Sequence, residues 1–193
     1  MRISKPLVFI SIFIALLGCT KEPALKFYSL DTPTVSPVYA NIFKNKSIKV
    51  TYPQSLKSKV SQKMNFSYSS VDSGYYQNSE WSNNMRKLLQ GTFVEVLDES
   101  RLFKVVLSDT STVKEDYRLE STIFAFQHRV RGEHSDAIVS IQFNLLNIET
   151  GNLLKSKRFS YSEATPTTDA KGYASATNVA VSKLSSDLVD WLK

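Results

Sequence analysis

Three long stretches of alternating residues, separated by two short turns, constrain the fold of this chain more than any other feature. They are residues 117–130, 137–148 and 153–161. One face of the second stretch carries only apolar residues, namely Val139, Ile141, Phe143 and Leu145. A period of two is typical of a strand with one buried face. The turns between the stretches contain Gly132 and Gly151, and glycine adopts the positive φ that tight turns need. The sequence therefore predicts an antiparallel meander of three strands.

Two amphipathic helices are predicted around this meander. The first follows the N-cap candidates Asn78 and Ser79, and Gln90 is expected on its polar face. Its apolar stripe has the period of an α-helix and consists of Trp81, Met85, Leu88, Leu89, Phe93, Val96 and Leu97. The second follows the cap candidates 167–169, with the stripe Tyr173, Ala176, Ala180, Leu184, Leu188 and Trp191. Shorter apolar stretches at 47–53, 64–70 and 102–107 read as strands, the last as a buried one. The predicted class is α+β, with two helices packed on a mixed, largely antiparallel sheet.

The only cysteine, Cys19, follows eleven uncharged residues, 7–17, and a basic N-terminus. A helix of that length rises roughly 17 Å, which is too short for the ~30 Å hydrocarbon core of a membrane. The pattern predicts a secretory signal over residues 1–18. The stretch 16–19 resembles a bacterial lipoprotein box, which implies that Cys19 carries acyl chains such as palmitate after cleavage before it. A buried cysteine in a signal-anchor helix is the alternative.

The residues after Cys19 bear on location and domain organisation. In Gram-negative lipoproteins an Asp directly after the lipidated cysteine favours retention in the inner membrane. The residue in that position here is Thr20, which favours an outer-membrane anchor that faces the periplasm. Residues 19–46 are expected to form a tether with a candidate strand at 25–30, and residues 47–193 one α+β domain. Removing residues 1–18 lowers the net charge from +6 to +4, because two basic residues leave. This weak, scattered charge and the periplasmic address do not favour nucleic-acid binding.

The sequence contains none of the common catalytic motifs, such as a P-loop, GxSxG or HExxH. His128 and His134 flank the turn at Gly132, but two histidines without a cysteine or paired carboxylates make a poor zinc site. We expect both to be half-exposed residues at strand ends. The sequence therefore predicts a protein that is not an enzyme and that uses no cofactor or metal.

A cluster of aromatic residues in the stretch GYYQNSEW, residues 74–81, is the strongest candidate for a binding site. It is predicted to be a loop that leads into the first helix. Tyr75 and Tyr76 fit no apolar stripe, and tyrosine is favoured at interfaces because it joins apolar area to a polar tip. They are the predicted partner contacts, together with Trp81, for which a core position at the start of the helix is the alternative.

The order of these features resembles the ABC-type transport auxiliary lipoprotein family, which includes the paraquat-inducible C lipoprotein. Tyr28 and Leu30 match its Tyr-x-Leu segment, Pro53 and Leu56 its Pro-x-x-Leu, and Trp81 its helix-opening tryptophan. The resemblance implies a fold similar to the N-terminal domain of translocation protein B. It also implies a non-enzymatic role beside an ABC ATPase, a permease and a periplasmic protein of the mammalian-cell-entry (MCE) type, in the transport of lipids or other hydrophobic compounds. A lipid-binding carrier and an assembly factor of another envelope complex are the alternatives, and homo-oligomerisation is left open.

The lipoprotein interpretation predicts that Cys19→Ser abolishes acylation and fractionation with the outer membrane, because the substituted side chain offers no thiol for acyl transfer. Incorporation of labelled palmitate and density fractionation of envelopes measure both effects. A wild-type chain that incorporates no palmitate contradicts the interpretation.

Overall fold

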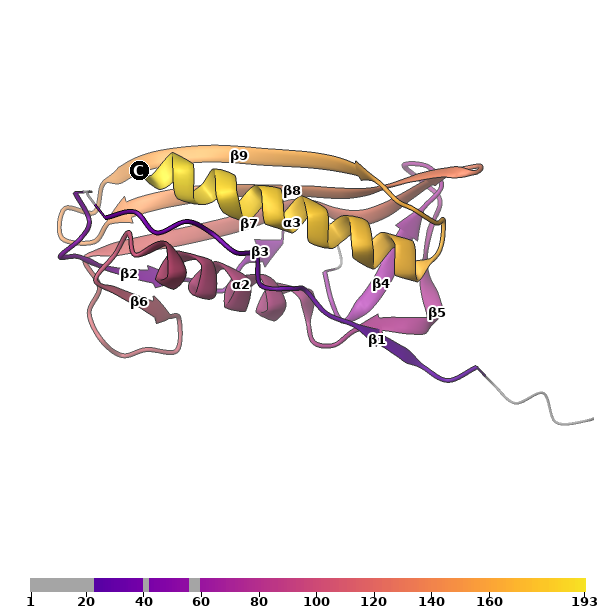
Figure 1. Cartoon of the computed structure of the whole chain (residues 1–193), viewed down its shortest axis with the longest axis horizontal. Helices are drawn as coiled ribbons and strands as arrows, with labels where there is room; N and C mark the ends of the chain where they lie inside the picture. Colours follow the sequence, from indigo (N-terminus) through magenta and orange to yellow (C-terminus); the bar gives the residue numbers. More distant parts are fainter. Residues whose placement is uncertain (1–22, 40–41, 56–59) are drawn as a thin grey trace, which may run out of the picture.

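The structure, a computed structural model of the whole chain, describes residues 23–39, 42–55 and 60–193, so Cys19 and the predicted signal lie outside the described residues. One mixed sheet forms a layer, and two helices lie over one face of it (Figure 1). The strands are β1 (Lys26–Tyr28), β2 (Ser47–Val50), β3 (Gln54–Ser55), β4 (Lys63–Ser67), β5 (Ser73–Trp81), β6 (Val105–Ser108), β7 (Tyr117–Arg131), β8 (His134–Asn147) and β9 (Leu153–Ala164). The helices are α2 (Met85–Ser100) and α3 (Ala170–Leu192). The predicted α+β class is confirmed.

The predicted meander is also confirmed. β8 pairs antiparallel with β7 on one edge and with β9 on the other. The β7–β8 ladder runs without interruption from the hairpin turn to Tyr117, apart from a register shift between Ile123 and Ala125. Gly132 and Gly151 adopt φ angles of 61° and 71°, the left-handed conformation that costs glycine little.

Short parallel strands occupy the other edge of β7. β2 pairs with its beginning, β3 with its middle and β4 with its end. β6 then extends β2, while β5 and β1 extend β4, so this side of the sheet divides into two branches. The stretch 102–107 was predicted to be a buried strand. Instead Leu102 and Phe103 are buried ahead of β6, which itself lies at the edge of the sheet.

The first helix begins later than predicted. Asn84 caps α2, and its side-chain oxygen accepts a hydrogen bond from the backbone N–H of Arg86 at 3.1 Å. Residues 73–81, predicted to be a loop and the first helical turn, form strand β5, because they pair with β1 on one side and β4 on the other. Trp81 at the end of β5 precedes Met85 by four residues. That spacing imitates a helical stripe, which is why periodicity placed Trp81 in the helix.

The core lies between the helices and the sheet. Ring pairs lock the layers together, with centroids 5.1 Å apart for Phe93 and Phe143 and 5.5 Å apart for Trp81 and Tyr173. Gln90 was expected on the polar face of α2. It is buried instead, and its amide donates to the carbonyl oxygen of Val50 at 3.1 Å, which satisfies two polar groups in the core.

α3 matches its prediction. Asp169 caps it, and the carboxylate accepts a hydrogen bond from the backbone N–H of Gly172 at 2.8 Å. The apolar stripe of α3 is buried except at Trp191, which is half-buried. No helix in the described residues is long and apolar enough to span a membrane.

The described part of the N-terminal segment, residues 23–39, packs against the domain. β1 lies inside the predicted strand 25–30 and pairs in parallel with β5. The chain then runs between α2 and α3 (Figure 1), where the backbone N–H of Asp31 donates to the side chain of Asn178 at 2.9 Å. Farther along, the N–H of Val38 donates to the carbonyl of Ser100 at 2.7 Å. This stretch of the predicted tether therefore lies along the helix layer.

Leu89→Ala is expected to lower the free energy of unfolding by about 2–5 kcal/mol, because Leu89 is fully buried and its truncation leaves a cavity. Lys87→Ala, on the exposed face of the same helix, should change it by no more than about 0.5 kcal/mol. A urea titration measures both, and equal effects would contradict the observed helix phase.

Candidate partner-binding surfaces

The long axis of the molecule separates two ends (Figure 1). We call one the β1 end: it carries the start of β1, the β4–β5 turn, the β7–β8 turn and the start of α3. We call the other the distal end: it carries the C-terminal ends of α2 and α3 and the segment near Tyr39. The aromatic cluster predicted from sequence lies at the β1 end.

The three predicted contact residues have different environments. Tyr75 is 39% exposed, and the amino group of Lys63 lies 5.6 Å from the centre of its ring. Tyr76 is half-buried, whereas Trp81 is 1% exposed and packs against Phe126 and Tyr173. Trp81 therefore offers a partner no surface in this structure. The predicted loop is wrong because these residues belong to β5, and neighbours on a strand point to opposite faces.

Tyr76 belongs to a buried aromatic stack that the sequence did not reveal. The ring of His128 lies parallel to that of Tyr173, with centroids 5.0 Å apart, and the ring of Tyr76 follows at 6.1 Å. The hydroxyl of Tyr76 is hydrogen-bonded to Nδ1 of His128 at 2.7 Å. The stack joins β5, β7 and α3, so Tyr76 holds the sheet and helix together at this end.

Both histidines were predicted to be half-exposed at strand ends, and neither of them is half-exposed. His128 is fully buried, while His134 is exposed at the start of β8. In the ladder His134 lies opposite Arg131, and His128 lies opposite Ala137. Within the described ranges, no three His, Cys, Asp or Glu side chains are grouped so that they could hold a metal ion.

Burial sets the protonation of the stack. It lowers the pKa of His128 below the usual value of about 6.5, against the opposing attraction of Asp169 and Asp136. Burial also raises the pKa of Tyr76 to about 12. Nε2 of His128 is buried without a hydrogen-bond partner among the described residues, so a positive charge on this ring would be poorly solvated. Burial therefore favours the neutral forms of His128 and Tyr76.

A groove of about 480 Å³ lies beside the stack, between β1, β5 and the start of α3. Tyr28, Tyr75 and Tyr76 line it, together with Lys26 and Asp169. Lys171 also lines it, so its walls combine aromatic rings with two basic side chains and one acidic side chain, which suits a polypeptide or another amphipathic surface.

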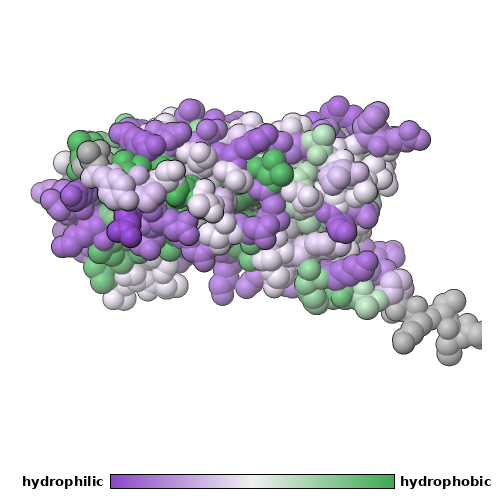
Figure 2. All heavy atoms as spheres, in the orientation of Figure 1, coloured by the Kyte–Doolittle hydropathy of each residue, from purple (hydrophilic) through white to green (hydrophobic). Residues whose placement is uncertain are grey.

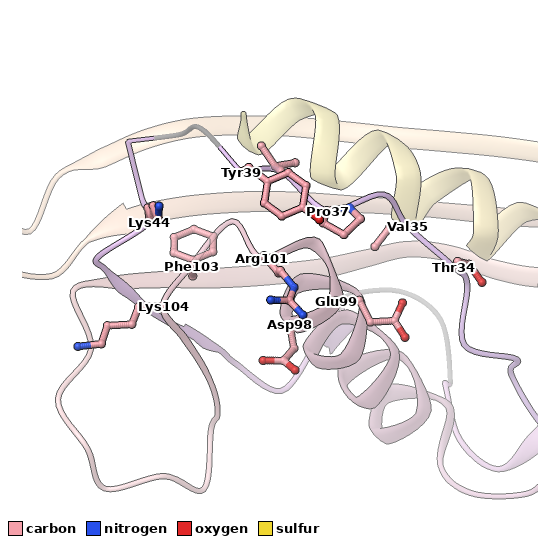
Figure 3. A pocket seen from close by; sticks show the side chains of 11 residues that line it. Thr34, Val35, Pro37, Tyr39, Lys44, Asp98, Glu99, Arg101, Phe103 and Lys104 are labelled. Carbon is pink, nitrogen blue, oxygen red and sulfur yellow. The ribbon is translucent and has the colours of Figure 1, made fainter.

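A larger groove, of about 750 Å³, lies at the distal end (Figure 3). Tyr39 and Pro37 reach it from the N-terminal segment, and Asp98, Glu99 and Arg101 reach it from the end of α2. Tyr39 is 74% exposed. Arg101 follows the helix with a φ of 53°, in the left-handed position that usually holds glycine.

Sequence reasoning missed the distal groove, because its walls come from segments about sixty residues apart that meet only when residues 34–39 pack against α2. The one local signal is Arg101, because it occupies a position after a helix at which glycine is usual.

Comparisons with known proteins agree with this architecture. Residues 28–189 match the family described as the ABC-type transport auxiliary lipoprotein component. No curated protein sequence matches the chain.

Among solved structures, a Xanthomonas campestris protein of the DUF330 family superposes with a TM-score of 0.75 at 19% identity, covering 86% of this chain and 93% of its own. A hypothetical protein from Chlamydia trachomatis has a TM-score of 0.52 at 5% identity, covering 77% of this chain and 95% of its own. The PelC dodecamer of Paraburkholderia phytofirmans has a TM-score of 0.50 at 12% identity, covering 80% of this chain and 94% of its own. At these identities the likenesses show the fold alone.

The buried stack predicts a pH dependence of stability. Because the pKa of His128 is lower in the folded chain, the unfolded chain binds more protons below about pH 6.5, so stability should fall as the pH drops from 7.5 to 5.5. Urea titrations at both pH values measure this change. In His128→Gln the change should be smaller, although that variant is less stable at pH 7.5.

His134→Gln is the matched control. Because His134 is exposed, this variant should keep the wild-type pH dependence of stability. A full wild-type dependence in His128→Gln would show that another group causes it.

Proposed function

Because this chain belongs to the family of ABC-type transport auxiliary lipoprotein components, we propose that it docks a periplasmic MCE-type protein at the membrane to which it is anchored. In this proposal Cys19 holds the protein in the outer membrane, facing the periplasm, and the protein performs no catalysis. The MCE protein acts with an ABC permease and ATPase in the transport of lipids or other hydrophobic compounds.

The main observation that favours docking over lipid carriage is that the interior of the domain is filled with side chains. A carrier needs internal space for an acyl chain. Here the space between helices and sheet is occupied by large side chains with 0–1% exposure, among them Trp81, Tyr173, Phe93 and Phe143. The two grooves described above are open to the surface. Surface grooves of this kind support recognition of a partner.

The distal groove is the docking surface that we favour. It lies at the opposite end from β1, where the chain leads back toward Cys19, so an anchored molecule presents it to the periplasm (Figure 1). Its exposed Tyr39 and its Arg101 belong to the residue types that carry most binding energy at protein interfaces. Tyr75, the contact predicted from sequence, is the second candidate surface.

Oligomerisation of this chain is a further proposal. The Paraburkholderia protein PelC, which shares the fold, forms a dodecamer. The mass of the detergent-solubilised lipoprotein distinguishes a monomer from an oligomer.

The docking proposal predicts that Tyr39→Ala combined with Arg101→Gly weakens binding to the MCE partner roughly thirtyfold, the loss expected when an anchor worth about 2 kcal/mol is removed. Arg101→Gly should not lower stability, because glycine adopts a positive φ without strain. Crosslinked pull-down from envelopes identifies the partner, and titration of the purified proteins measures its affinity.

Two controls sharpen this test. Lys87→Ala alters an exposed residue on the outer face of α2 and should leave the affinity unchanged. Tyr75→Ala tests the second surface, and a loss of affinity in that variant alone would move the docking site to the β1 end. Stoichiometric lipid extracted from purified residues 20–193, with no partner captured from envelopes, would favour the carrier.

A further inference from the structure

The anchor proposed above limits how the domain can lie on a membrane. Pro23, the first described residue, is four residues after Cys19, and four residues span at most about 15 Å even when fully extended. β1 begins three residues later, at Lys26. If Cys19 is acylated, the β1 end must therefore stay within a short distance of the lipid head groups.

That end exposes several large apolar and aromatic side chains. On β1, Phe27 is 58% exposed and Leu25 is also exposed. Figure 2 shows hydrophobic (green) atoms over β1. At the β4–β5 turn Val71 is 94% exposed, and Tyr68, three residues earlier in the sequence, is also exposed. We call Leu25, Phe27, Tyr68, Val71 and Tyr75 the apical residues.

The β4–β5 turn is held in place by hydrogen bonds, so Val71 is presented on an ordered tip. The backbone N–H of Tyr68 donates to the carbonyl of Asp72 at 2.9 Å. The hydroxyl of Ser69 accepts hydrogen bonds from the N–H groups of Val71 and Asp72 at 3.3 and 3.1 Å. An ordered tip loses little conformational entropy when its side chain enters another medium.

A basic groove of about 490 Å³ adjoins this tip. Arg129 and Arg131 line it, together with Tyr68, Gln127 and four serines, all of them neutral or basic side chains. Asp136 lies opposite Arg129 in the ladder, yet neither arginine forms a salt bridge with a residue that the structure describes. Guanidinium groups beside hydroxyls are suited to the phosphate of a lipid head group.

We propose that the β1 end is a membrane-binding surface, on which the apical residues enter the head-group region of a phospholipid bilayer while Arg129 and Arg131 bind lipid phosphates. The proposal rests on the Cys19 anchor and adds a defined orientation to it. The long axis points away from the membrane, and the distal groove is held toward the periplasm.

The anchored chain offers a direct test, because Cys19 is its only cysteine and is consumed by acylation. Val71→Cys therefore introduces a single reactive thiol, which is labelled with an environment-sensitive fluorophore. The lipidated protein is inserted into vesicles of phosphatidylethanolamine and phosphatidylglycerol, some containing lipids with a quencher on the head group. We expect a blue-shifted label that the lipid quencher reaches.

Val113→Cys is the matched control: it is also a strongly exposed valine, but it lies in the β6–β7 loop toward the distal end. Its label should remain solvent-exposed and unquenched. If the protein floats with the vesicles while the labels at 71 and 113 behave alike, the membrane-binding surface is wrong and the anchor stands. If the lipidated protein does not float with the vesicles, the anchor and the surface are both wrong.

The arginines are tested without the anchor. Partition of residues 20–193, which lack Cys19 and the predicted signal, onto the same vesicles should fall about fivefold for each change, Arg129→Gln and Arg131→Gln. Arg101→Gly removes the same charge at the distal end and should have no effect. If all three changes lower the partition equally, net charge alone explains the binding, and the proposed binding of lipid phosphates by Arg129 and Arg131 is wrong. Binding of inorganic phosphate by the groove, with no change in vesicle partition, would assign it to a soluble anion and overturn the lipid proposal.

Discussion

The pairing of β7 along both of its edges is the constraint on which the rest of the structure depends. On one edge it forms a continuous antiparallel ladder with β8. On the other edge it receives β2, β3 and β4 in turn. Its buried face supplies Leu119, Ile123 and Phe126 to the core, and the helices pack over that face. Because almost every strand is attached to β7 directly or through one neighbour, its register determines where both ends of the molecule lie.

Because the interior is filled, the candidate binding sites lie on the surface. The layers are closed by ring contacts such as those of Phe93 with Phe143 and Trp81 with Tyr173, and the grooves lie where the layers end. The N-terminal segment links the two ends, because it contributes Phe27 at β1 and Tyr39 at the distal groove. One stretch of chain therefore builds part of the proposed membrane surface and part of the proposed docking surface.

Sequence patterns were sufficient where the contacts that matter are local. The meander was predicted because alternation continues for more than ten residues in two of its strands and the turns contain glycine. α3 was predicted because a cap and a long apolar stripe agree. The patterns misled at β5, where the spacing from Trp81 to Met85 joins a strand to a helix. They also misled at Gln90, whose polarity suggests exposure although a backbone carbonyl satisfies it in the core.

The sequence by itself determined the α+β class, the meander, the second helix and the likeness to a transport lipoprotein family, because these depend on periodicity and on short motifs. Only the tertiary structure decided that Tyr75 and Tyr76 sit on a strand, that His128 is buried between two tyrosines, and that segments about sixty residues apart form the distal groove. The physical reason is that parallel pairing and burial are contacts between distant parts of the chain. The residues next to His128 or Gln90 in the sequence do not indicate which distant segment will bury that side chain.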